Sequence, residues 1–223
     1  MIEYAAGDHR DQGYLSIPPG GSGLGVLVIQ EWWGLVDHIR GVCDRLAAEG
    51  FVGLAPDLYD GRSTTEPDEA QKEMMNLRIE AAGSDIEAAS AYLLDSPRVT
   101  GSSIGVVGFC MGGGLALYAA SRLPEITACV AFYGVGPARE SLDTSSMKAA
   151  VQGHWGERDR SYDHATIEAL ETRLRDAAVD VESFWYDADH AFFNDDRPEV
   201  YDQEAARLAW ERTTAFLHRR LAR

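Results

Sequence analysis

The spacing of its apolar segments constrains the fold of this chain more than any other feature. Short apolar runs bounded by turn residues alternate with stretches that have the helical period of about 3.6 residues. The expected strands are residues 25–30, 52–56, 104–109, 128–133, 149–155 and 181–186. The expected helices are residues 36–49, 69–94, 112–122, 165–178 and 203–221. Apolar strands separated by helices predict the α/β class, a mostly parallel sheet covered by helices on both faces.

The rest of the chain adds few elements to this pattern. Residues 2–4 and 13–17 look like an antiparallel hairpin at the start. Residues 61–76, rich in polar residues, are the natural place for a mobile loop or cap. We find no internal repeat and no linker. A chain of 223 residues that is 45% hydrophobic can bury one core, so we predict one domain over residues 1–223.

One short motif indicates chemistry. The apolar run 104–107 leads directly into Gly108-Phe109-Cys110-Met111-Gly112. This is the pattern of a nucleophile elbow, a sharp strand-to-helix turn that exposes a reactive side chain at its tip. The flanking glycines allow the strand and the helix to approach each other. Cys110 is therefore a candidate nucleophile.

Composition excludes several classes of function. A formal net charge of −16 disfavours binding to nucleic acid or to an anionic membrane, since both need clustered Lys and Arg. No segment has the length of an apolar membrane span, and the N-terminus lacks the pattern of a signal peptide. The cysteine count of 3 suits reduced thiols in the cytoplasm, with Cys43 and Cys129 as inert core residues. No ligand pattern suggests a metal site, and we expect no cofactor.

A cysteine nucleophile needs a base, and in α/β-hydrolases the acid and then the histidine follow the nucleophile along the chain. Of the later histidines, His190 follows a strand within a polar turn, at the sheet edge where catalytic groups gather in open α/β folds. His154 lies in an apolar strand and fits a core position better. His164 follows a capping aspartate, and His218 lies on a helix among arginines. We therefore predict that His190 is the base.

The acid that orients this base should follow the preceding strand. Asp159 fits this position best, with Glu157 as a solvated alternative. Asp163 is better explained as the N-cap of the next helix. An ordinary turn aspartate is the alternative interpretation of Asp159.

Together these motifs resemble the dienelactone hydrolase (carboxymethylenebutenolidase) family. The resemblance extends from about residue 26 to the last helix. The segments that are similar are Gln30-Glu31-Trp32-Trp33-Gly34, Ala55-Pro56-Asp57-Leu58-Tyr59, Gly108-Phe109-Cys110-Met111-Gly112-Gly113, Phe132-Tyr133-Gly134-Val135-Gly136, Gly156-Glu157-Arg158-Asp159 and Asp189-His190-Ala191-Phe192-Phe193. The cysteine elbow combined with the Gln-Glu strand end is more specific than either part alone.

The resemblance implies an α/β-hydrolase fold with a triad of Cys110, His190 and Asp159. It also implies that Glu31 contacts the thiol and helps to generate thiolate when substrate binds. A carboxylate at the end of an apolar strand is desolvated and can accept a proton, although a structural pair with Arg40 is the alternative. The N–H groups of Met111 and Trp32 would form the oxyanion hole.

The substrate site departs from the family pattern. Asn194 stands where the best-known members have an arginine, so dienelactone itself is in doubt as the substrate. Lys72, Arg78 or Arg197 could supply a cation instead. Side chains that we expect to contact substrate are Trp33, Tyr133, Phe192 and Asn194.

The predicted activity is hydrolysis of a small ester or lactone through a thioester on Cys110. The chain would act without a cofactor, as a monomer or small homo-oligomer. The rival hypothesis is a non-catalytic protein of the same fold that binds a small ligand or uses Cys110 as a redox-sensing thiol. Retention of His190 and Asp159 in order favours the enzyme, because a binding protein would not need them.

Overall fold

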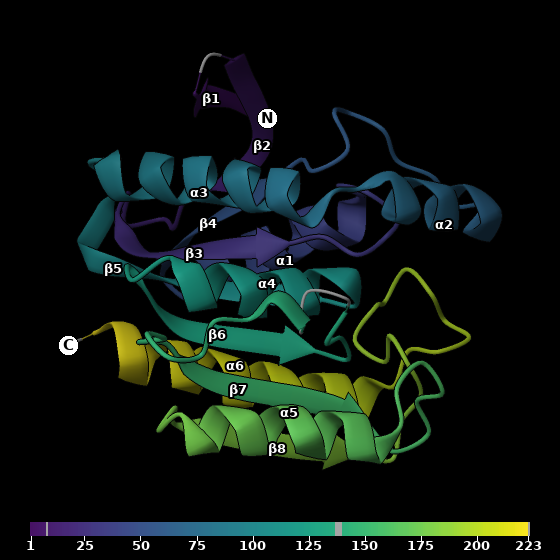
Figure 1. Ribbon diagram of the computed structural model, residues 1–223. Coiled ribbons are helices and arrows are strands. Elements are labelled where there is room, and N and C mark those ends of the chain that lie inside the picture. Colours follow the sequence, from purple (N-terminus) through teal and green to yellow (C-terminus); the bar gives the residue numbers. More distant parts are fainter. Residues whose placement is uncertain (8, 137–139, 223) are drawn as a thin grey trace.

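The computed structural model describes residues 1–7, 9–136 and 140–222. Its strands form one eight-stranded sheet in the order β1-β2-β4-β3-β5-β6-β7-β8 (Figure 1). The strands are β1 (Ile2–Ala6), β2 (His9–Ser16), β3 (Gly23–Ile29), β4 (Phe51–Pro56), β5 (Val99–Phe109), β6 (Ile126–Phe132), β7 (Ala150–Gly156) and β8 (Val181–Tyr186). β2 pairs antiparallel with β1 and β4, and the strands from β4 to β8 pair in parallel.

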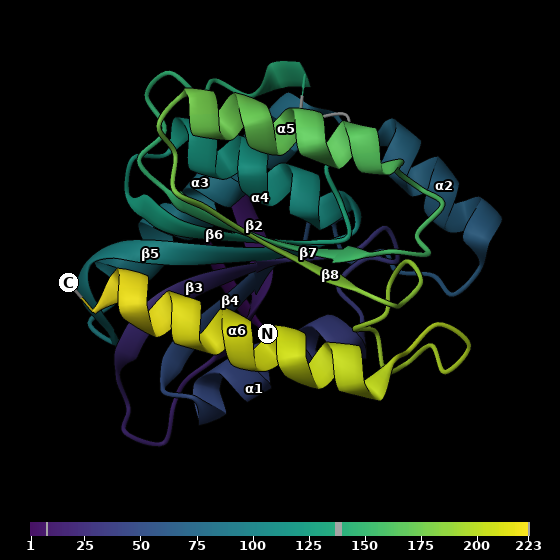
Figure 2. The ribbon, with the colours of Figure 1, turned by 90° about the horizontal axis from the view of Figure 1, so that it is seen from below.

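Helices cover both faces of this sheet. They are α1 (Asp37–Ala48), α2 (Pro67–Asn76), α3 (Ile79–Asp95), α4 (Met111–Arg122), α5 (His164–Asp176) and α6 (Gln203–Leu221). Figure 2 shows α3, α4 and α5 on one face and α1 and α6 on the other. Each face of the sheet packs against its helices to form a hydrophobic core. Along β3, Leu27 and Ile29 belong to the core with α3, α4 and α5, whereas Val26 and Val28 belong to the core with α1 and α6. The two cores explain why the central strands are apolar throughout, and they confirm the predicted fold class.

The helix predicted over residues 69–94 is not continuous in the structure. Residues 69–94 form two helices, because Leu77 and Arg78 are extended, with ψ of 117° and 127°. Leu77 packs against the core of α3 and α4, so a tertiary contact interrupts a sequence that has no Gly or Pro at the break. Within the segment 61–76, expected to be a mobile loop or cap, helix α2 begins at Pro67, two residues before the predicted helix start at residue 69.

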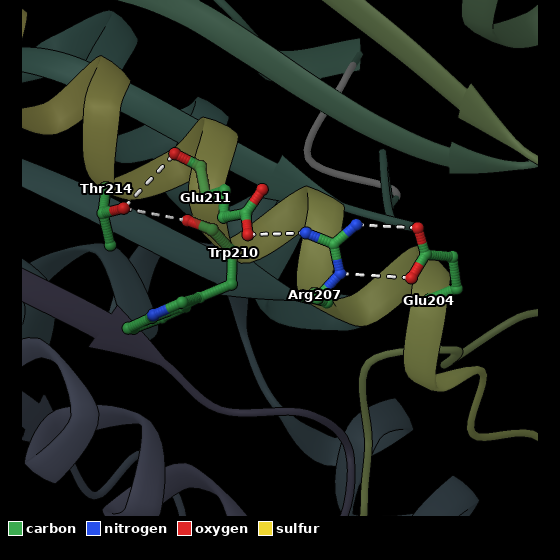
Figure 3. Close-up of polar contacts among 5 residues, drawn as sticks. All are labelled: Glu204, Arg207, Trp210, Glu211 and Thr214. Atoms are coloured by element: carbon green, nitrogen blue, oxygen red, sulfur yellow. Dashed lines mark hydrogen bonds and ion pairs between the residues drawn. The ribbon is translucent and has the colours of Figure 1, made fainter.

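The last helix has a charged outer surface. Arg207 forms ion pairs with Glu204 and Glu211, one turn away on either side (Figure 3). The hydroxyl of Thr214 donates to the carbonyl groups of Trp210 and Glu211, at 3.1 and 3.3 Å. Within the described residues, no helix is both long enough and apolar enough to cross a membrane.

The topology gathers polar residues at one edge of the sheet. Parallel strands end at the same edge, where the arrowheads of Figure 1 lie. The residues that follow the ends of β3, β5, β6, β7 and β8 at this edge include Glu31, Cys110, Tyr133, Asp159 and His190. Segments that are far apart in the sequence therefore meet there.

Candidate active site

Cys110 occupies the tip of a strained turn between β5 and α4. Its backbone has a φ of 53° and a ψ of −119°, in a region that a residue with a side chain rarely adopts. A Cβ atom on Gly108 would lie 1.9 Å from the carbonyl oxygen of Gly112, and one on Gly134 would lie 1.7 Å from that of Cys110. Both glycines are required because backbone fills the space of their missing side chains. The structure thus has the geometry of the predicted elbow.

Three side chains form a continuous line at this tip. The Cys110 Sγ atom lies 3.3 Å from Nε2 of His190, and Nδ1 of His190 lies 2.7 Å from Oδ2 of Asp159. The imidazole is 27% exposed and the Asp159 side chain 8% exposed. The histidine is therefore accessible from solvent, whereas the acid behind it is nearly buried.

The loops after β7 and β8 fix this arrangement. Oδ1 of Asp159 accepts a hydrogen bond from the Ser161 backbone N–H at 2.7 Å, which leaves Oδ2 for His190. Ala191, next to His190, is in the left-handed region with a φ of 61°. Glu157 is exposed, and Asp163 caps α5 by accepting from the Thr166 N–H at 2.8 Å. The structure thus places Asp159, and neither of its alternatives, against the imidazole.

The pKa of His190 reflects opposing influences. Burial favours the neutral ring, but the hydrogen bonds with Asp159 and Cys110 and the charges of both groups outweigh it and raise the pKa to about 10. The imidazole therefore holds its proton more firmly than a free histidine does, and its Nε2 atom lies within hydrogen-bond reach of the thiol.

Glu31 is buried beside these residues, with 1% of its surface exposed. Its Oε1 accepts from the Tyr133 hydroxyl at 3.2 Å, and its Oε2 accepts from Nδ2 of Asn194 at 2.6 Å. Among the described residues, no hydrogen bond joins Glu31 to Cys110, and the thiol contact expected on substrate binding stays a prediction. Arg40 pairs with Asp37 at 3.0 Å, not with Glu31. The carboxylate is thus held by two neutral donors.

Tyr133 connects Glu31 to the imidazole. Burial and the nearby charges of Glu31 and Cys110 raise the pKa of its phenol well above the usual range, so the hydroxyl remains a donor. Its ring meets the His190 ring edge-on, with centroids 5.2 Å apart. Phe192 packs behind it, fully buried between Tyr133 and Tyr186. Phe192 therefore packs behind the site, and it does not line the site as expected of a residue that contacts substrate.

The predicted oxyanion donors lie at the ends of β5 and β3. Met111 is the first residue of α4, where helix geometry leaves the backbone N–H without an intrahelical acceptor. The Met111 sulfur accepts a hydrogen bond from the buried Tyr59 hydroxyl at 3.5 Å, a contact that sequence analysis missed. Trp32, directly after Glu31, is partly exposed, and its ring meets that of Trp33 edge-on at 5.0 Å.

A hollow of about 280 Å³ borders the site. It is lined by Trp33, Val36, Thr64, Thr65, Asn194, Asp196, Arg197 and Glu199. Arg197 lies over the Trp33 ring at 4.7 Å and bonds to Glu199 at 2.7 Å, so its charge is already paired. Of the other predicted cations, Lys72 is exposed on α2 and Arg78 lines a separate hollow with Tyr59.

Three further histidines, His154, His164 and His218, have the structural positions expected of them, and a fourth, His38, makes a contact that was not expected. His154 is buried in β7, and burial lowers the pKa of its ring to about 3. His164 begins α5, and His218 is exposed on α6. The unexpected contact is that of His38, buried on α1, with Asp195, which no sequence motif suggested. It joins residues 157 positions apart, which only the tertiary structure brings together.

A group of potential metal ligands lies on the first hairpin and α3. Ligand atoms of His9, Asp11 and Asp85 all lie within 4.8 Å of one another. Sequence analysis did not find this group, because Asp85 is far from His9 and Asp11 in the chain and the three fit no ligand spacing. Acidic groups near the surface often cluster without a metal, so the group alone indicates no site.

Comparisons with known proteins agree with the geometry. The sequence profile of the Dienelactone hydrolase family matches residues 12–221. The chain is 35% identical over 224 residues to Protein usf of Aquifex pyrophilus, covering 97% of this chain and 96% of that protein. It is 33% identical to a carboxymethylenebutenolidase of Pseudomonas sp. (strain P51), covering 96% and 92%. The solved structure of a dienelactone hydrolase-like promiscuous phosphotriesterase from metagenomic libraries superposes with a TM-score of 0.88 at 25% identity, covering 98% and 96%.

Proposed function

Because this chain belongs to the dienelactone hydrolase family of ester and lactone hydrolases, we propose that it hydrolyses a small carboxylic ester or lactone through a thioester on Cys110. The observation that supports this mechanism best is the line from Sγ of Cys110 through His190 to Asp159, at 3.3 and 2.7 Å. The same groups in this order form a nucleophile, a base and an orienting acid.

In the acylation step, His190 holds the proton of the Cys110 thiol, and the resulting thiolate attacks the carbonyl carbon of the substrate. The oxygen of the tetrahedral intermediate accepts hydrogen bonds from the N–H groups of Met111 and Trp32. The C–O bond to the leaving group then breaks, and His190 returns its proton to the departing alkoxide. The products of this step are an alcohol, or the opened lactone, and a thioester on Cys110.

In the second step, His190 removes a proton from water, which attacks the thioester carbonyl. Collapse of this intermediate breaks the C–S bond and releases the carboxylic acid. Asp159 holds the imidazole so that Nε2 faces sulfur and water in turn. No step requires a metal or a cofactor.

Glu31 has a supporting role in this proposal. Its Oε1 atom accepts from the hydroxyl of Tyr133, whose ring contacts His190, so it helps to hold Tyr133 against the imidazole. It can also accept the thiol proton when a bound substrate moves it away from Tyr133 or Asn194. The hollow beside Trp33 and Asn194 would receive the part of the substrate that does not react.

The composition and the free cysteines suggest where the protein acts and with which partners. Cys43, Cys110 and Cys129 are free thiols, which suits a reducing compartment, and we propose a cytoplasmic enzyme. With a net charge of −16 we expect no nucleic acid and no membrane as partners. A monomer or small homo-oligomer would suffice, because the groups of the proposed mechanism come from one chain.

The test is replacement of the nucleophile. C110A should abolish turnover of 4-nitrophenyl acetate, and the wild-type protein should show a transient acetyl adduct by intact mass. C129A is the matched control, because Cys129 is buried in β6 and should leave the rate per folded molecule unchanged. Wild-type turnover by C110A would refute the mechanism. Peroxide oxidation of Cys110 without ester turnover would favour the redox-sensing alternative.

A further inference from the structure

A second histidine–aspartate pair lies beside the site and has no part in the proposed mechanism. Nδ1 of His38, in the first turn of α1, lies 2.8 Å from Oδ1 of Asp195. The His38 side chain is 1% exposed and that of Asp195 56% exposed. The hydrogen bond from His38 holds the pKa of Asp195 below its usual range, with a contribution from the charge of Arg45. The bond is therefore charge-assisted.

A histidine is energetically less favourable than an apolar residue at the buried position of His38. Its ring stands edge-on to Phe109 and Phe193, with centroids 6.0 and 6.1 Å away. Its Nε2 atom is shielded from solvent and has no hydrogen-bond partner among the described residues. An unsatisfied polar atom among aromatic rings costs free energy that an apolar side chain would avoid. The bond to Asp195 is the interaction that distinguishes His38 from an apolar residue here.

Asp195 belongs to a tightly bonded turn that also contains Asn194. Within it, the Asn194 N–H donates to the Ala191 carbonyl at 2.9 Å, and the Asp196 N–H donates to Oδ1 of Asn194 at 3.1 Å. The Arg197 N–H donates to the Asn194 carbonyl at 3.1 Å. A displacement of Asp195 therefore moves the Asn194 side chain.

Asn194 connects this turn to the buried carboxylate. Its Nδ2 donates to Oε2 of Glu31 at 2.6 Å, and only 2% of Asn194 is exposed. A continuous series of contacts thus runs from α1 through His38, Asp195 and Asn194 to Glu31. The same helix contacts the neighbouring Phe193, because Arg45 lies over its ring at 4.8 Å, and Arg45 also lies over the ring of Trp210 on α6 at 4.2 Å.

We propose that His38 is a positioning residue: by holding Asp195 it fixes the turn so that Asn194 keeps Glu31 oriented beside the Cys110–His190 pair. The proposal rests on the proposed function, since its effect is on the formation and acylation of the Cys110 thiolate. His38 touches neither the substrate nor the reacting atoms. Its influence passes through Asn194 to Glu31.

Two amide substitutions at His38 separate positioning from packing. In H38N the amide nitrogen takes the place of Nδ1 and can donate to Asp195, whereas in H38Q it takes the place of Nε2 and faces the aromatic rings. Both variants place an amide in the same core, so we expect similar losses of thermal stability. H38Q should lower the single-turnover acylation rate with 4-nitrophenyl acetate by about 10- to 100-fold, as small misplacements of catalytic groups do. H38N should stay near the wild-type rate, and KM should change little in either.

A double-mutant cycle tests the route. N194A should lower the acylation rate as H38Q does, and H38Q/N194A should be little worse than N194A, because residues that act in series are not additive. H218Q, on the exposed part of α6, is the histidine control and should match the wild type. Equal rates for H38N and H38Q, or full additivity with N194A, would overturn the proposal.

A second readout keeps this test separate from the proposed function. The rate of Cys110 alkylation by iodoacetamide reports the thiolate without any turnover. If C110A retained esterase activity, the proposed function would fail, and the alkylation rates would still decide the role of His38. Slower alkylation in H38Q than in H38N supports positioning, and equal alkylation refutes it.

Discussion

The His190–Asp159 and His38–Asp195 pairs have nearly the same length, 2.7 and 2.8 Å, but opposite exposure. In the first, the imidazole is 27% exposed and the carboxylate 8%. In the second, the imidazole is 1% exposed and the carboxylate 56%. The first imidazole has the Cys110 sulfur 3.3 Å from its other nitrogen, whereas the corresponding nitrogen of His38 is shielded by rings.

The comparison shows that a histidine–aspartate bond does not by itself make a base. A catalytic imidazole must reach a nucleophile and then water, so its outer nitrogen has to face an open space. The acid behind it is most effective when solvent is excluded from the bond. Only the His190 pair meets both conditions. The His38 pair is arranged to hold a turn, with the ring inside and the carboxylate at the surface.

Neutralising each acid tests whether the two pairs have different roles. D159N should lower kcat by about 10⁴-fold, because the amide can leave the imidazole in the wrong tautomer. D195N should lower it by no more than about 100-fold, since it affects only positioning. Ester turnover measured side by side checks both variants. Equal losses would show that the difference in exposure does not separate the two roles.

The titration of the His190 ring tests the environment that distinguishes it from His38. NMR of the ring should give a pKa near the value of about 10 that the site produces, and D159N should move it toward that of a free histidine. Folding raises this pKa above the value of about 6.5 in an unfolded chain, so the contribution to stability is complete below that pH. It is lost as the pH rises through about 10. A ring that titrates below neutral pH would contradict the proposed ion pair.

His154 shows what burial does to a histidine that has no acid. Arg212 donates to the Tyr186 hydroxyl, which donates to Nδ1 of His154 at 2.8 Å, so the ring proton lies on Nε2, 3.0 Å from the Gln152 amide oxygen. Burial, helped by the charge of Arg212, lowers its pKa to about 3. The neutral ring therefore stabilises the fold fully above the unfolded value of about 6.5.

Acid should remove that stability. Below pH 6.5, the free energy of unfolding should fall by about 1.4 kcal/mol per pH unit from this residue, until the pH approaches the folded pKa. Urea unfolding at several values between neutral pH and pH 4, compared with H154Q, measures the slope. The variant should be less stable at neutral pH but less sensitive to acid. Identical slopes would show that His154 is not the group that titrates.

Asp163 and His164 provide the smallest expected effect. They are neighbours in sequence, yet Asp163 caps α5 through the Thr166 N–H and does not serve the active site. D163A should cost about 1 kcal/mol of stability, as the loss of an N-cap usually does. Ester turnover per folded molecule should be unchanged. A large loss of activity would mean that Asp163, and not only Asp159, supports His190.

Much of the fold was predictable from local patterns. Strand Val181–Tyr186 and helix Gln203–Leu221 have the predicted limits, because apolar period and polar boundaries coincide there. The break at Leu77 and Arg78 was missed, since it depends on how Leu77 packs and not on any helix-breaking residue. Contact of Asn194 with substrate stays a prediction: Asn194 lines the hollow beside Trp33, and its amide also donates to Glu31, a bond that the sequence did not indicate.

Local patterns in the chain were sufficient to predict the elbow, the parallel sheet and the candidate groups Cys110, His190 and Asp159. Strand ends, glycines and polar turns are local features, and parallel strands bring their carboxyl ends to one edge. The tertiary structure decided which carboxylate faces His190, which neutral donors hold Glu31 and that His38 meets Asp195. Those contacts depend on side-chain direction and burial between residues up to 163 positions apart, a separation over which no local pattern has information.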